Sequence, residues 1–307
     1  MREPALIPLV VIMGPTGIGK TRLAAEIGPR WGAEVISVDS RQFYRGMDIG
    51  TAKPSPAELA QVRQHLIDIA APDETVGLAR FLELARPLIQ EIHRRGKLPF
   101  LVGGTGQYIR ALLQGWQVPH VPPDPELRAE LEALASQDPD ALWQRLLALD
   151  AGAVEFIHPH NLRRIIRALE VSLKAGQPFS ELRRRIPPPY RVLQIGLTME
   201  REALYARVDA RVEAMLDAGL EEEVRRLLDD GYGWELPAMS GLGYSQLRPY
   251  LAGECTLAEA AERIKLDTHD FIRRQYTWFN GAEIRWVDVT EEPAVATARL
   301  LADFVSG

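Results

Sequence analysis

The sequence has a single cysteine and no hydrophobic run long enough to cross a bilayer. With only Cys255, the chain can form no internal disulfide and no multi-cysteine zinc site, and one thiol fits a reducing compartment. The apolar run 6–13 is too short to span a membrane and is not followed by a small-residue cleavage site, so it is expected to be a buried strand. We therefore expect a soluble, cytoplasmic protein without membrane attachment.

The chain also lacks an excess of positive charge. Its 307 residues carry a net charge of −6, which argues against a generic nucleic-acid coat protein. With 46% hydrophobic and 25% charged residues it has the composition of a globular protein of one large domain or two. The segment 163–191 departs from this balance, because its cations exceed its acids by six. Such a segment either binds a polyanion locally or forms a solvated, arginine-rich helix face.

The first third of the chain alternates strands with helices. The pattern β-α-β-α-β predicts an α/β fold with a parallel sheet and flanking helices. Strands are expected at 6–13, 34–38 and 98–102, and helices at 21–30, from the capping box at Ser55 to Asp68, and from Thr75 to Gly96.

The middle third has helical signals and no strand pattern. Proline-rich stretches at 118–125 and 187–189 bracket it, and a strand pattern at 190–199 predicts a return to the sheet. The remainder is expected to contain helices at 200–218, 220–230, 256–279 and 293–305 and a short strand at 283–287. We therefore predict a core formed by residues 1–112 and 190–307 and an all-helical insertion domain over 113–189.

The most specific motif is a phosphate-binding loop between the first strand and the first helix. It fits G-x-x-x-x-G-K-[ST], and its residues are Gly14, Pro15, Thr16, Gly17, Ile18, Gly19, Lys20 and Thr21. Backbone amides of this P-loop (residues 14–21) would surround a diphosphate at a helix N-terminus. Lys20 would add a positive charge and the Thr21 hydroxyl a Mg²⁺ ligand, so the core is expected to be of the P-loop type and to bind a phosphorylated ligand.

Asp39 and Thr105 follow two of the predicted strands. The later strand runs into Gly-Gly-Thr-Gly at 103–106, without the acid that motor and switch NTPases usually carry there. Because strands of an open α/β sheet converge on the ligand crevice at their carboxyl ends, Asp39, Thr105 and the P-loop should face one pocket. Asp39 could ligate Mg²⁺, act as a general base toward an acceptor, or cap its own loop. This arrangement favours group transfer over nucleotide hydrolysis.

Two groups of arginines could contact phosphates. Arg207 and Arg211 lie four residues apart on a predicted helix, where they could stabilise a charged leaving group or pair with surface acids. Arg163, Arg164 and Arg167 are spaced to share a helix face and could follow a nucleic-acid backbone.

Several motifs in this order resemble those of the tRNA dimethylallyltransferases. The resemblance rests on the P-loop together with 37–42 (SVDSRQ), 103–108 (GGTGQY), 48–54 (DIGTAKP), 65–68 (HLID), 161–170 (NLRRIIRALE), Arg207…Arg211-Val212…Met215, 241–244 (GLGY) and 274–279 (RQYTWF). It covers the chain from about Val10 to Trp278. The P-loop has Gly17-Ile18 where Ala-Ser is more usual in the family, and no cysteine/histidine finger follows the core, as in the short bacterial type.

The resemblance implies a reaction and a set of site residues. The P-loop would hold dimethylallyl diphosphate with Mg²⁺, and Asp39 would accept a proton from N6 of adenosine-37 beside the tRNA anticodon. Thr105 and Arg211 would support the diphosphate and the reacting geometry, and the target base would leave its stack to enter the pocket. The insertion would contact the anticodon stem-loop, and we expect the enzyme to be a monomer. The residues expected to contact tRNA are Asp39, Ser40, Arg41, Gln42, Gln107, Arg163, Arg164, Ile165, Ile166, Arg167 and Arg274.

Two other functions remain open from the residues alone. A P-loop small-molecule kinase would place ATP in the loop and use Asp39 to activate a hydroxyl, but it predicts neither the basic insertion nor the Gly-Gly-Thr-Gly block. A non-catalytic, RNA-binding nucleotide switch is the second alternative, and it does not explain the presence of Asp39 and Arg211.

Overall fold

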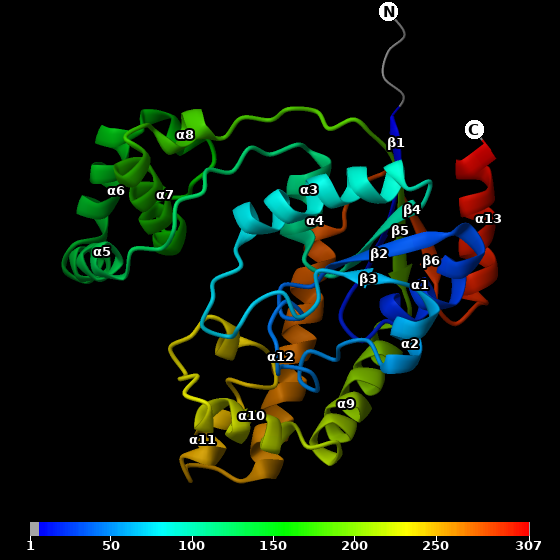
Figure 1. Ribbon diagram of the computed structural model, residues 1–307. Coiled ribbons are helices and arrows are strands. Elements are labelled where there is room, and N and C mark those ends of the chain that lie inside the picture. The colour runs from blue at the N-terminus through cyan, green and yellow to red at the C-terminus, as the bar shows by residue number, and fades with distance from the viewer. Residues whose placement is uncertain (1–5, 307) are drawn as a thin grey trace, which may run out of the picture. The chain divides into compact units, whose positions relative to one another are not determined.

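The computed structural model describes residues 6–306, which form a six-stranded sheet with helices on both sides (Figure 1). The strands are β1 (Ile7–Met13), β2 (Ala33–Val38), β3 (Gln64–His65), β4 (Leu98–Gly103), β5 (Tyr190–Thr198) and β6 (Ile284–Asp288). Helices of the first and last parts of the chain are α1 (Lys20–Ile27), α2 (Pro56–Gln61), α3 (Leu78–Arg94), α9 (Arg201–Asp217), α10 (Leu220–Asp229), α11 (Leu247–Leu251), α12 (Leu257–Trp278) and α13 (Pro293–Ser306). The middle of the chain forms α4 (Gly106–Leu113), α5 (Pro125–Gln137), α6 (Pro139–Leu149), α7 (Leu162–Ala175) and α8 (Phe179–Leu182). Single 3₁₀ turns are η1 (Gly28–Trp31), η2 (Ala151–Glu155) and η3 (Ala238–Ser240).

Every pairing in the sheet is parallel, and the strand order is β3-β2-β4-β1-β5-β6. β1 lies between β4 and β5, with Val10 opposite both Phe100 and Leu193. A strand in this position is covered on both faces, which is why its sequence is a continuous apolar run. The predicted fold class and the return of the chain to the sheet at β5 are confirmed.

Two layers of helices cover the sheet. Alternate residues of the strands, such as Val10 and Ile12, pack with residues of α1, α9 and α13 in one core cluster. The intervening residues point to the opposite face, since side chains alternate along a strand. Figure 1 shows α1 and α13 on one side of the sheet and α3 on the other.

One predicted helix was too long. The capping box at Ser55 is present and starts α2, but α2 ends at Gln61 and does not reach Asp68. Val62 is extended and packs against Gly28, and the following residues join the sheet as β3 beside β2. Pairing with the open edge of β2 is therefore favoured over continuation of the helix, because that edge offers backbone hydrogen-bond partners to a parallel strand.

Other elements begin or end within a few residues of their expected positions. The helix expected from Thr75 begins at Leu78, after the N-cap residue Gly77. Helices α4 and α11 were not foreseen, since each is short.

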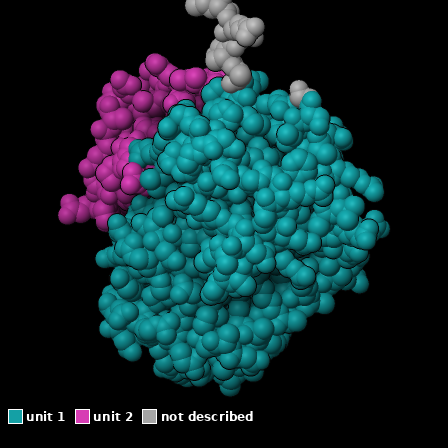
Figure 2. All heavy atoms as spheres, turned by 45° about the vertical axis from the view of Figure 1, so that its right-hand side comes forward, with its two compact units in different colours: residues 1–77, 81–110, 189–307 teal, residues 78–80, 111–188 magenta. Residues whose placement is uncertain are grey.

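The chain divides into two compact units, coloured separately in Figure 2. The first consists of residues 1–77, 81–110 and 189–307 and contains the sheet, and the second consists of residues 78–80 and 111–188. The second unit has its own apolar core, formed by residues of α5, α6 and α7 such as Leu131, Leu142 and Ile165. Within the described residues, no helix is both long and apolar enough to cross a membrane.

Candidate active site

The P-loop links β1 to α1 in a conformation that glycine makes possible. Gly17 and Gly19 have φ angles of +78° and +99°, a region that residues with a Cβ rarely adopt. Gly19 is the N-cap residue of α1 and offers no side chain to the first amides of that helix. Those amides and the positive end of the helix dipole therefore remain available for an anion, as the sequence motif predicts.

Helix α9 packs directly against the P-loop. A Cβ placed on Gly17 would lie 2.3 Å from Cγ1 of Val208, and one on Gly19 would lie 3.3 Å from Nη2 of Arg207. Val208 is buried at this contact, while Arg207 is exposed. The α9 sequence thus brings an arginine to the edge of the phosphate-binding loop, which is the position expected for a cation that neutralises a leaving group.

Lys20, Asp39 and Arg211 form the charged centre of the site. Burial lowers the pKa of the Lys20 ammonium to about 8, the Asp39 carboxylate opposes this shift, and Arg211 adds to it. Burial likewise lowers the pKa of the Arg211 guanidinium, against the effect of Asp39. The Lys20 ammonium also donates to the carbonyl of Pro15 at 2.8 Å. Two cations thus share one carboxylate, and an anionic ligand would relieve their mutual repulsion.

Asp39 lies at the end of β2, in a turn held by hydrogen bonds. One of its carboxylate oxygens accepts the amide of Arg41 at 3.0 Å, and the amide of Ser40 donates to the Thr105 hydroxyl at 3.3 Å. The amide of Thr105 in turn donates to the carbonyl of Val38 at 3.2 Å. Thr105 therefore lies beside the Asp39 turn, as the convergence of strand ends predicted.

The Gly-Gly-Thr-Gly segment at 103–106 provides space for close packing. A Cβ on Gly103 would lie 2.2 Å from the carbonyl oxygen of Val38, and one on Gly106 would lie 2.4 Å from Cβ of Trp278. Side chains at these positions would push β2 and α12 away from β4. The block is therefore a structural requirement for bringing Thr105 to Asp39.

Gln275 is a site residue that sequence reasoning missed. Its side-chain oxygen accepts the amide of Thr16 in the P-loop at 2.8 Å, and its nitrogen donates to the carbonyl of Gly104 at 3.0 Å. The side chain is buried and joins two segments that are distant in sequence. Its position in 274–279 (RQYTWF), one of the segments on which the resemblance rests, was the signal available in the sequence.

Replacing Gln275 with leucine is expected to lower the free energy of unfolding by about 1–3 kcal/mol, since it leaves the Thr16 amide and the Gly104 carbonyl without their partner. Urea denaturation followed by circular dichroism measures the effect. Arg274→Leu, on the exposed face of the same helix, is the control and should change the value by less than roughly 0.5 kcal/mol. Equal stability of the two variants would contradict this bridging role.

Two residues of the Asp39 turn have structural partners of their own. Gln42 is buried and accepts the Ser37 hydroxyl at 3.0 Å. Arg41 donates to the carbonyl of Pro237 at 2.5 Å and to the hydroxyl of Ser240 at 3.1 Å. By contrast, Gln107 and Arg274 are exposed and available to a ligand.

In the second unit, the predicted contact segment of α7 has two faces. Ile165 and Ile166 are buried in the apolar core of this unit, whereas the arginines beside them point away from it. Their apolar spacing is the core face of an amphipathic helix. Arg163 and Arg164 are exposed at the start of α7, whereas Arg167 pairs with Glu170 and donates to the carbonyl of Val121.

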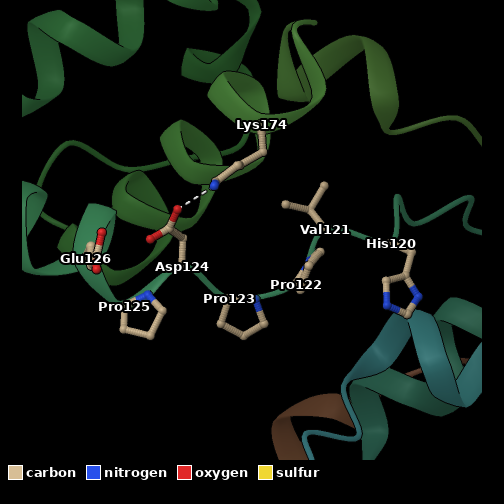
Figure 3. Close-up of a pocket in the computed structure, with 8 residues that line it drawn as sticks. All are labelled: His120, Val121, Pro122, Pro123, Asp124, Pro125, Glu126 and Lys174. Carbon is tan, nitrogen blue, oxygen red and sulfur yellow. Dashed lines mark ion pairs between the residues drawn. The ribbon is translucent and has the colours of Figure 1, made fainter.

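The second unit also contains a surface hollow of about 600 Å³, lined by residues 120–126 and Lys174 (Figure 3). The only ion pair drawn there joins Asp124 to Lys174 at 2.5 Å, and Asp124 also caps α5. These charged groups already have structural partners, and the hollow contains none of the residues predicted for catalysis. We therefore place the candidate active site at the P-loop.

Comparison with known proteins gives one consistent family. The model of the IPP transferase family matches residues 42–282. A curated tRNA dimethylallyltransferase of Roseiflexus sp. (strain RS-1) is 57% identical over 275 residues, covering 89% of this chain and 90% of that protein. The tRNA dimethylallyltransferase of Dehalococcoides mccartyi is 44% identical over 307 residues, covering 99% and 94%.

Solved structures agree with these relatives. The full-length tRNA isopentenylpyrophosphate transferase of Bacillus halodurans is 40% identical with a TM-score of 0.72, covering 98% of this chain and 97% of that one. A eukaryotic dimethylallyltransferase, described as acting on tRNA, is 27% identical with a TM-score of 0.82, and the match covers 97% of this chain and 79% of that one.

Proposed function

The chain belongs to the IPP transferase family, and from this premise we propose how its site transfers a dimethylallyl group to tRNA. The enzyme is a transferase that modifies tRNA, and its donor is dimethylallyl diphosphate. N6 of adenosine-37 in the anticodon loop attacks C1 of the donor, the C1–O bond breaks, and diphosphate leaves. The observation that carries this assignment is the charged centre, where a carboxylate lies beside a P-loop and two cations.

Asp39 is the general base of this reaction. The exocyclic amine of adenine is a weak nucleophile because its lone pair is delocalised into the ring, so removal of its proton as the N–C bond forms lowers the barrier. The Asp39 carboxylate receives that proton, and its turn fixes it beside Thr105. A positioned base is typically worth ~10²–10⁴-fold in rate.

The departing diphosphate is stabilised by the P-loop and its cations. The amides at the start of α1 and the Lys20 ammonium hold the diphosphate, and Arg211 neutralises charge that develops as the C1–O bond breaks. Arg207, at the edge of the same loop, adds to this positive field. The arrangement favours the transition state because negative charge on the bridging oxygen grows while the allylic carbon becomes cationic.

The chemistry of the donor groups fits a magnesium ion. Thr21 supplies a hydroxyl oxygen at the start of α1, and the diphosphate supplies further oxygens of the kind that Mg²⁺ prefers. Among residues 6–306 no cluster of three or more His, Cys, Asp or Glu side chains could hold a metal, so Thr21, the diphosphate and water would provide its ligands. When bound, Mg²⁺ supplies charge neutralisation to the leaving group.

The second unit carries the surface best suited to the tRNA backbone. Burial lowers the pKa of the Arg183 guanidinium, and the neighbouring cations Arg185 and Arg164 lower it further. Arg183 lies over the ring of Phe156, with its guanidinium carbon 3.8 Å from the ring centroid. Clustered arginines are suited to phosphates, and we propose that this surface holds the anticodon stem-loop.

Replacing Arg163 and Arg164 together with alanine should weaken tRNA binding and reduce the slope of log affinity against log salt concentration by roughly 2. Both side chains are exposed, so folding should be unaffected. Filter binding of unmodified tRNA at several salt concentrations measures the slope. Arg145→Ala/Arg226→Ala is the charge-matched control, and an unchanged slope in the Arg163/Arg164 variant would exclude this face from the interface.

The Lys20 pKa of about 8 predicts a pH dependence of donor binding. Below pH 8 the ammonium is charged and attracts diphosphate, and above pH 8 the free enzyme loses that charge. The dissociation constant for dimethylallyl diphosphate should therefore rise roughly 30-fold between pH 7 and 9.5, since each unit above the pKa reduces the charged fraction about tenfold. Calorimetric titration measures it. Lys20→Ala should bind weakly without this rise, and the same rise in that variant would assign it to another group.

Labelled substrates test the function directly. The purified protein receives unmodified tRNA and Mg²⁺ with either labelled dimethylallyl diphosphate or γ-labelled ATP. Label that enters tRNA only from the prenyl donor is the expected result. Phosphate transferred or released from ATP, without prenyl incorporation, would favour the P-loop kinase instead. The monomeric state and the cytoplasmic location remain predictions from the sequence.

A further inference from the structure

Glu223 is a buried carboxylate away from the charged centre, and its hydrogen bonds are directed at one loop. It lies on α10 with 1% of its surface exposed. One oxygen accepts the amides of Asp48 and Ile49 at 2.8 Å each, and the other accepts the amide of Gly50 at 3.1 Å and the hydroxyl of Tyr244 at 2.6 Å. Burial and the Glu223 carboxylate raise the pKa of the Tyr244 hydroxyl, which keeps it protonated as a donor.

Burial of a carboxylate at this position costs free energy. The surrounding cluster is apolar and includes Val212, Leu220 and Leu227. Removing a charge from water is unfavourable unless its hydrogen bonds are restored, and an apolar residue would pack here at lower cost. The benefit of Glu223 is therefore the order that it imposes on its donors, three of which are consecutive backbone amides.

The loop held by Glu223 in turn holds the turn that carries Asp39. Gln42 donates its side-chain amide to the carbonyls of Thr51 and Ala52 at 3.4 and 3.3 Å. The backbone amide of Gln42 donates to the carbonyl of Asp39 at 3.2 Å. The path from Glu223 to the Asp39 backbone therefore consists of the loop 48–52 and one buried glutamine.

A second path reaches the same turn through Tyr244. This tyrosine is buried and contacts Gly50 so closely that a Cβ there would lie 2.5 Å from its ring. Tyr244 ends the segment 237–244, which also contacts Arg41, the second residue after Asp39. The Arg41 guanidinium donates to the carbonyl of Pro237 and to the hydroxyl of Ser240. Glu223 thus anchors two of the segments that contact the Asp39–Gln42 turn.

We propose that Glu223 is a positioning residue for prenyl transfer, which fixes the Asp39 carboxylate relative to the P-loop through the loop 48–52 and the segment 237–244. This inference rests on the proposed function, in which Asp39 is the general base. Glu223 is therefore expected to affect the reacting geometry and not the affinity for dimethylallyl diphosphate or tRNA. The P-loop and the exposed Arg163 and Arg164 lie outside both paths.

The test measures kcat and KM separately for Glu223→Gln, a change that preserves size but replaces an acceptor oxygen with an amide donor. We expect kcat to fall roughly 10- to 100-fold, since a displacement of about 1 Å in a reacting group has effects of this order. KM values for dimethylallyl diphosphate and tRNA should stay within about threefold of the wild type. Tyr244→Phe, which removes one of the four bonds, should give a smaller loss of the same kind, and Glu222→Gln, exposed on the same helix, should give none.

A double variant separates positioning from mere stabilisation. Glu223→Gln should cause no further loss in single-turnover rate when Asp39 is already asparagine, since a base that is absent cannot be misplaced. If Glu223 had a purely structural role, the losses in rate caused by the two substitutions would multiply in the double variant, and that result would overturn the inference. An unchanged kcat in Glu223→Gln, or a rise in KM that matches the fall in kcat, would overturn it as well. If Glu223→Gln fails to fold, the same comparison with Asp39→Asn is made with Tyr244→Phe. Loss of the proposed function itself is recognised separately, as absence of prenyl transfer by the wild type or full activity of Asp39→Asn.

Discussion

Replacing Asp39 with asparagine should lower the rate of prenyl transfer roughly 10²- to 10⁴-fold, the range expected when a positioned general base is removed. Asparagine keeps the shape of the side chain and can still accept the Arg41 amide, so the turn should survive. It cannot receive the proton from adenine N6. The affinities for tRNA and dimethylallyl diphosphate should therefore remain within a few-fold of the wild type.

Single-turnover transfer of labelled dimethylallyl to tRNA measures the chemical step, and filter binding measures the affinity for tRNA. The control is Asp73→Asn, an exposed aspartate whose replacement should leave both quantities unchanged. If the affinity for tRNA fell in parallel with transfer in Asp39→Asn, the aspartate would be a binding or folding residue. Retained transfer would remove the general base from the proposed mechanism.

Replacing Arg211 with glutamine should lower kcat roughly 10²- to 10³-fold, as removal of one donor from a developing anion does in other enzymes. Arg211 opposes Lys20 electrostatically and lies near Asp39, so the free site carries two mutually repelling cations. Negative charge on the bridging oxygen grows as the C1–O bond breaks, so the guanidinium contributes more in the transition state than in the bound ground state. KM for the donor should therefore change less than kcat.

Arg211→Lys is the informative companion, because it restores charge without the planar guanidinium. We expect an intermediate kcat if charge is the main contribution and no recovery if the geometry of the guanidinium is required. Arg201→Gln, exposed at the start of the same helix, is the matched control. A rise in KM with unchanged kcat in Arg211→Gln would assign this residue to ground-state binding.

The sequence by itself determined the features that depend on neighbouring residues. The P-loop was readable because its glycines, Lys20 and Thr21 must follow a strand and open a helix, and these constraints act within eight residues. The apolar runs of β1 and β4 identified central parallel strands for a similar reason, since burial on both faces leaves no room for polar alternation. Asp39 and Thr105 followed from the rule that strand ends converge.

Only the tertiary structure decided the features that depend on contacts between distant segments. Gln275 contacts Thr16 across 259 positions, and Glu223 contacts Asp48 across 175, so a local pattern predicts neither contact. The same holds for β3, where pairing with β2 overrode a well-capped helix, and for Ile165 and Ile166, which the core of the second unit buries. Local sequence specifies which elements form, whereas the free energy of buried polar pairs is gained only when those elements meet.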